Sequence, residues 1–84
     1  MNPKMQGYTR YLENQFRWSG SFFAALFGAI SNSDEGNRAK LALGFPFEVE
    51  AYNTWTRVGR DAFLAECDPD HPLVKGIEAG THQL

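Results

Sequence analysis

The chain has 84 residues, of which 43% are hydrophobic and 21% are charged, and its formal net charge is −2. So short a chain makes one domain rather than two, and its apolar fraction is too high for a disordered protein. The small net charge excludes a protein that coats nucleic acid or anionic lipid through charge alone. We therefore treat residues 1–84 as a single helical domain, for reasons that follow.

The distribution of helix-breaking residues predicts an all-α fold. Gly, Pro, Ser and Asn fall where helices would end, β-branched strand formers are few, and no Asn-Gly or Asp-Gly hairpin turn occurs. We expect a small compact bundle of three to five helices. Residues 1–7 and 80–84 should be frayed, because chain ends without strong capping signals are poorly held.

The first expected helix spans residues 8–30 and is long and rich in aromatic side chains. Asn2-Pro3 offers an earlier and weaker start, which Gly7 opposes. At 100° per residue, its apolar side chains fill an arc of roughly 200°, about twice the width found in an ordinary amphipathic helix. A straight helix of this length would measure ~34 Å, as much as the width of the whole domain. We therefore expect a bend at Ser19–Ser21, since Gly and Ser pairs are common kink points.

Small residues spaced by four, Gly20, Ala24 and Gly28, lie on the other side of this helix. Two interpretations are open: a groove for close helix packing within the fold, or the flat centre of a contact between molecules. We favour the internal groove, because a small protein needs its smooth surfaces for its own core.

Three shorter helices are expected after the aromatic one and should pack around it: residues 34–43, 46–58 and 60–67. Gly44 occupies the left-handed position that commonly follows a helix, and Pro46 suits the first position of the next one. A break near Gly59 separates the second from the third. Pro72 then opens a last short turn.

Two features of the sequence indicate the cellular compartment: it has one cysteine, and it has no long apolar segment. Cys67 cannot form an internal disulfide, whereas small secreted proteins usually rely on several. The longest apolar run, residues 22–30, is shorter than the ~20 residues that cross a bilayer, and it begins too late for a signal peptide. We expect a cytoplasmic protein without a membrane segment.

The densest ionisable cluster comprises Cys67, Asp68, Asp70 and His71. A zinc site needs three or four converging ligands, and only His82 adds to this set. A nucleophilic cysteine needs a histidine within hydrogen-bond reach and would have a lowered pKa, which neighbours around prolines seldom provide. We expect Cys67 to pack as a small hydrophobic residue and an aspartate to cap a turn, with no catalysis, metal or cofactor.

The aromatic surface of the first helix suggests binding. Either the later helices cover all of it, or part of it stays open in so small a bundle. Aromatic and arginine side chains dominate the energies of protein interfaces. We predict that Tyr11, Trp18 and Phe22 anchor a partner, with Arg10 and Arg17 as charges at the rim.

The sequence thus predicts a small non-catalytic protein-binding module. It would occupy a surface of a larger protein, as a phage or prokaryotic accessory protein or inhibitor does, or associate with itself. No small-molecule substrate is indicated.

The alternative is a nucleic-acid-associated regulator that uses the basic N-terminal helix, because aromatics stack on bases and arginines hold phosphates. We disfavour it, since Arg10 and Arg17 would face away from the aromatic arc.

Overall fold

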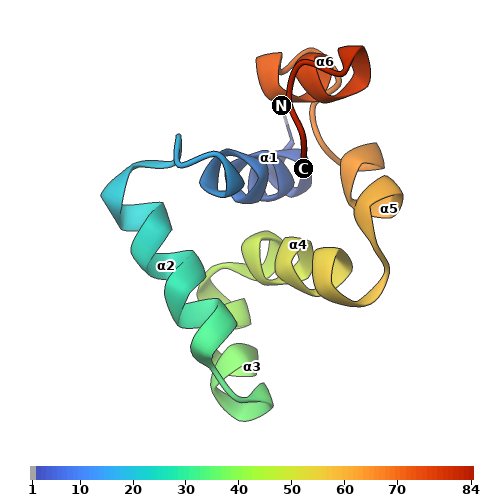
Figure 1. Cartoon of the computed structure of the whole chain (residues 1–84). Helices are drawn as coiled ribbons and strands as arrows, with labels where there is room; N and C mark the ends of the chain where they lie inside the picture. Colours follow the sequence, from blue (N-terminus) through green and yellow to red (C-terminus); the bar gives the residue numbers. More distant parts are fainter. Residues whose placement is uncertain (1) are drawn as a thin grey trace.

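Six helices form the computed structural model, which describes residues 2–84 and has no strand among them. They are α1 (Pro3–Gln15), α2 (Gly20–Asn32), α3 (Glu35–Gly44), α4 (Pro46–Arg57), α5 (Arg60–Ala65) and α6 (Pro72–Ala79). The all-α prediction is confirmed (Figure 1). The number of helices exceeds the expected three to five, because the long first helix is divided in two.

α1 begins earlier than we predicted from the sequence. The Asn2 side chain accepts a hydrogen bond from the Met5 backbone N–H at 2.7 Å, and Pro3 fits the first helical position. Gly7 is tolerated within the helix because α4 lies against it: a Cβ at Gly7 would be 2.6 Å from the Cβ of Phe47. Residues 3–7, which we expected to be frayed, are therefore part of α1.

A full break replaces the bend predicted at Ser19–Ser21, so the helix expected over residues 8–30 does not exist as one rod. The chain turns at Arg17, whose φ of 61° is the one positive value among the described residues other than glycine. Gly20 follows with φ of 77°, a conformation that glycine adopts without steric cost. An α-helix cannot continue through left-handed residues, so α1 and α2 point in different directions.

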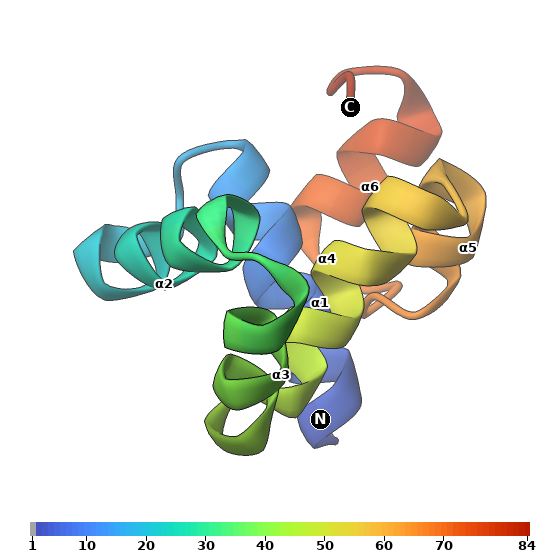
Figure 2. The same ribbon diagram turned by 90° about the horizontal axis from the view of Figure 1, so that it is seen from below.

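α1 and α4 cross at the centre of the fold. α2 and α3 lie at one end of the molecule and α5 and α6 at the other (Figures 1 and 2). The ring of Phe63, from α5, lies 5.4–5.6 Å from the rings of Tyr8, Tyr11 and Trp55. The buried core comprises Tyr8, Tyr11, Leu12, Leu26, Phe27, Ile30, Val49, Ala51, Phe63, Cys67, Leu73, Val74 and Ile77. α3 contributes none of these residues.

The chain after α6 packs back onto the fold. Gly80 ends the helix in the left-handed conformation (φ 81°), and the Thr81 N–H donates to the Gly76 carbonyl at 2.8 Å. The His82 ring lies so close to Gly76 that no side chain would fit between them. Leu84 packs against the core. Residues 80–84, which we expected to be frayed, are therefore held by these contacts.

Candidate functional site

Tyr11, one of the three predicted anchors, belongs to the core. It is 6% exposed, and its ring packs edge-on against Phe27 at 5.1 Å and Phe63 at 5.6 Å. The predicted role in binding is wrong for this residue, because α2, α4 and α5 surround its side of α1. Burial raises the pKa of its phenol, which keeps the side chain neutral.

Trp18 and Phe22, the other two predicted anchors, are 54% and 59% exposed. Their rings have different neighbours. Trp18 lies 6.3 Å from the His71 ring and 6.5 Å from the His82 ring, next to α6. Phe22 lies 6.0 Å from the ring of Phe45, at the start of α4. The two exposed aromatics therefore do not share an aromatic cluster.

The two arginines predicted at the rim of the binding surface also have different surroundings. The Arg10 guanidinium lies over the Phe23 ring, 4.2 Å from its centroid, and the side chain is half-buried in this cation–π contact. Arg17 is exposed in the loop between α1 and α2, and it forms no ion pair with any part of the chain from residue 2 to residue 84. Of these two arginines, Arg17 is the one whose charge is exposed to a partner.

The outer side of α2 is open to solvent and carries no charged side chain. Only Leu26, Phe27 and Ile30 of this helix are buried, and none of its residues is charged. Figure 1 shows α2 along one edge of the molecule, with no helix over its outer side, and Figure 2 shows it projecting away from α5 and α6. The exposed residues of the helix are Gly20, Ser21, Phe22, Ala24, Ala25, Ala29, Ser31 and Asn32. We call this surface the outer face of α2.

The stripe of small residues lies on this outer face. A Cβ added at Gly20 or Gly28 would meet no atom within 4 Å, so no other helix packs there. The internal-groove interpretation is therefore wrong, and close packing within the fold uses Gly7 of α1 instead. Periodicity could not show this, because it does not say which side of a helix its neighbours cover.

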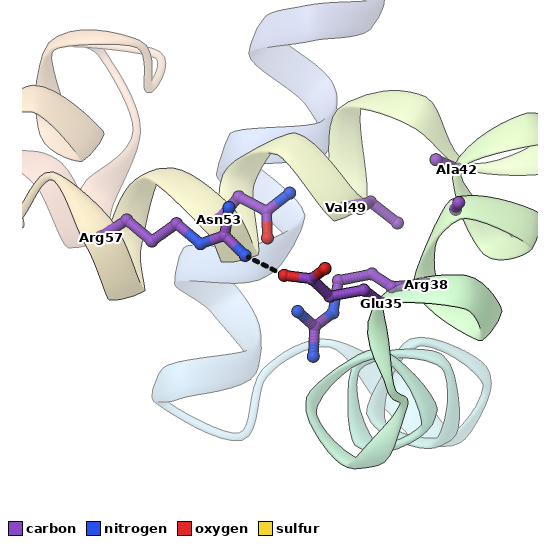
Figure 3. Close-up of a pocket in the computed structure, with 7 residues that line it drawn as sticks. Glu35, Arg38, Ala42, Val49, Asn53 and Arg57 are labelled. Carbon is purple, nitrogen blue, oxygen red and sulfur yellow. Dashed lines mark ion pairs between the residues drawn. The ribbon is translucent and has the colours of Figure 1, made fainter.

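A groove of about 320 Å³ lies between α3 and α4 (Figure 3). It is lined by Glu35, Arg38, Ala39, Ala42, Val49, Asn53 and Arg57. Arg57 pairs with Glu35 at 3.7 Å across its mouth, and both side chains are largely exposed. The buried Oδ1 of Asn53 has no hydrogen-bond partner among residues 2–84.

The arginines of this groove are already engaged. Arg38 donates to the carbonyls of Ser33 at 2.7 Å and Ile30 at 3.3 Å, and its guanidinium lies 4.8 Å from the centroid of the Tyr52 ring. These contacts use Arg38 to hold α2, α3 and α4 together. The groove consequently lacks a free cation that could bind a phosphate or a carboxylate.

Cys67 lacks both the exposure and the lowered pKa of a nucleophilic cysteine. It is 2% exposed, and its Sγ–H donates to the Phe63 carbonyl at 3.6 Å. Burial raises the pKa of the Cys67 thiol to about 12, with smaller effects from the Glu66 and Asp68 carboxylates. Asp68 accepts a hydrogen bond from the Asp70 N–H at 3.0 Å, which is the expected cap of a turn.

His71 is turned away from Cys67. Its Nε2 lies 3.1 Å from the Glu13 carboxylate, and its Nδ1 accepts the Leu73 N–H at 3.1 Å, which caps α6. One ring nitrogen thus ties the start of α6 to α1, and the other caps α6 itself. Residues 2–84 contain no group of three His, Cys, Asp or Glu side chains that could hold a metal ion.

Comparison with protein-family models, curated proteins and solved structures finds no match to this chain. Across residues 2–84, every helix is too short or too polar to cross a membrane. The outer face of α2 is uncharged and carries an exposed aromatic residue, Phe22.

Proposed function

We propose that this protein is a non-catalytic protein-binding module, and that it docks onto its partner through the outer face of α2. The observation that carries the proposal is a 13-residue helix without a charged side chain whose outer face is open. Phe22, near the N-terminal end of this helix, is 59% exposed. Exposed helix faces are normally polar. Interface cores are depleted in charge and enriched in aromatic residues.

The fold holds this face rigidly, which favours binding. Leu26, Phe27 and Ile30 fix α2 to the core, so little conformational entropy remains to be lost when a partner docks. The Phe45 ring lies beside Phe22 and extends the apolar surface toward α4. Arg10 is half-buried over the Phe23 ring, so of the two N-terminal arginines only Arg17 is exposed to contact a phosphate.

Site-specific photo-cross-linking tests the proposal. A photoreactive phenylalanine analogue replaces Phe22 in one variant and Asp61 in a control variant; the Asp61 side chain is 97% exposed, on α5. We expect irradiation in the cells that naturally make the protein to give a discrete protein adduct from position 22 and none from position 61. The proposal fails if position 22 gives no adduct, or if both positions label the same proteins equally.

A further inference from the structure

The outer face of α2 has features of a surface that pairs with itself. We propose that its occupant is a second copy of this chain, with the two α2 helices antiparallel about a twofold axis between Ala25 and Leu26. The inference rests on the proposed function, since it names the partner of that same face. Twofold pairs are the commonest soluble oligomers, and each copy then contributes the same surface.

Charges of opposite sign flank α2. Arg17 is exposed just before the helix, Asp34 is exposed just after it, and no charged residue lies between them. In an antiparallel pair, the end of α2 that is preceded by Arg17 lies next to the end of the other copy's α2 that is followed by Asp34. A parallel pair would instead place like charges together. The opposite charges at the two ends of α2 therefore favour pairing with a second copy, and they favour the antiparallel arrangement of the two helices.

The shapes of the side chains are complementary about the same axis. Phe22 of each copy lies opposite Ala29 of the other, so that a large side chain meets a small one twice. Ala25 lies at the axis, and Gly28 leaves space next to it. Small residues allow two helices to approach closely, because their separation depends on the side chains at the contact.

The position of α2 leaves room for this partner. The helix lies along one edge of the molecule in both views, so a second helix along its outer side would not meet α5 or α6 (Figures 1 and 2). Thirteen residues make a helix of about 20 Å, so the contact is smaller than a standard interface of ~800 Å² per partner. We therefore expect a weak dimer that exchanges with the monomer.

Sedimentation equilibrium of the purified chain tests the pairing. Between about 5 and 500 µM, the mean mass should rise from one chain toward two. Ala25→Asp places a charge at the axis and should weaken the dimer at least ~10-fold. The matched control, Ala62→Asp, puts the same charge on an exposed residue of α5 and should leave the dissociation constant unchanged.

Two substitutions that preserve the local backbone test the direction of the helices. Arg17→Asn removes a charge where asparagine tolerates the positive φ, and Asp34→Asn keeps the cap of α3. In the antiparallel pair, each should weaken the dimer about threefold, and the double variant should be no weaker than either one. In a parallel pair, each would remove a like-charge contact and strengthen the dimer.

The outcomes separate this inference from the proposed function. A chain that stays monomeric at all concentrations, or a dimer that Ala25→Asp leaves intact, overturns the second-copy inference. If position 22 nevertheless cross-links a different protein in cells, the proposed function stands alone. If position 22 cross-links nothing, both fail.

Discussion

The Cys67 thiol is held in its neutral form by its surroundings, with a pKa raised by burial to about 12. We predict that in the native protein at pH 8 it reacts with an aromatic disulfide reagent at least about a hundredfold more slowly than in the unfolded chain, because the thiolate is the reactive species. The released aromatic thiol is measured by absorbance, with and without denaturant. Equal rates in both conditions would show that the thiol is accessible and ionised.

Tyr11, Trp18 and Phe22 show how much of the site the sequence could predict. Composition and periodicity correctly identify them as large side chains on the apolar side of the first segment. Their exposure depends on which neighbours cover each turn of helix, which is a property of the whole fold. The break at Arg17 reorients α2 relative to α1, and arginine at positive φ is too uncommon for a sequence pattern to predict.

The close approach of α1 to α4 depends on the absence of a side chain at Gly7. Gly7→Ala would place a Cβ 2.6 Å from the Cβ of Phe47, and we predict a decrease of about 1–3 kcal/mol in the free energy of unfolding. At Gly36, on α3, the nearest atom to an added Cβ is the Asp34 Oδ1 at 3.6 Å, an ordinary contact. Gly36→Ala should therefore raise the free energy of unfolding by about 0.5–1 kcal/mol.

Urea unfolding followed by circular dichroism at 222 nm measures both variants under identical conditions. Because the substitution is the same and both glycines are helical, a difference in sign isolates the contact with Phe47. Stabilisation by both substitutions would mean that α1 and α4 do not approach closely at Gly7.

Helix boundaries that local signals set are well predicted, and those that tertiary contacts set are not. Pro46 starts α4 at the expected residue, and α3 ends within a residue of the expected span. Gly44, which we expected in the left-handed conformation after the helix, is instead the last residue of α3 and has no positive φ. From the sequence, the start of α1 at Pro3 is only the weaker alternative, because the contact that accommodates Gly7 in the helix lies forty residues away on α4. Such a contact has no signature in the local sequence.

At the scale of the molecule, the core is unevenly distributed. α3 buries no residue and α2 buries three, whereas α6 alone contributes Leu73, Val74, Gly76 and Ile77. The end formed by α2 and α3 is thus the least buried part of the fold, and it carries the proposed binding face. A partner that binds only the folded chain would stabilise this end by mass action.

Alkaline pH should unfold the whole molecule cooperatively. Burial raises the pKa of Tyr8 to about 12, and the Glu50 carboxylate, which accepts the Tyr8 hydroxyl hydrogen bond at 2.7 Å, also raises it. The pKa of Cys67 is raised to about 12 as well, and burial raises that of Tyr11. In the unfolded chain, these groups titrate at about pH 9–10, so the unfolded state releases its protons first.

The contribution of these groups to stability is therefore complete below about pH 9 and is lost as the pH rises to about 12. We predict that helical circular dichroism and phenolate absorbance near ~295 nm change together in this range. Tyr8→Phe removes one group whose pKa is raised in the folded protein, so stability should fall less steeply with increasing pH. The lost hydrogen bond should lower the free energy of unfolding at pH 7 by about 1 kcal/mol. Phenolate formation by all tyrosines with full helicity retained would contradict the burial of Tyr8 and Tyr11.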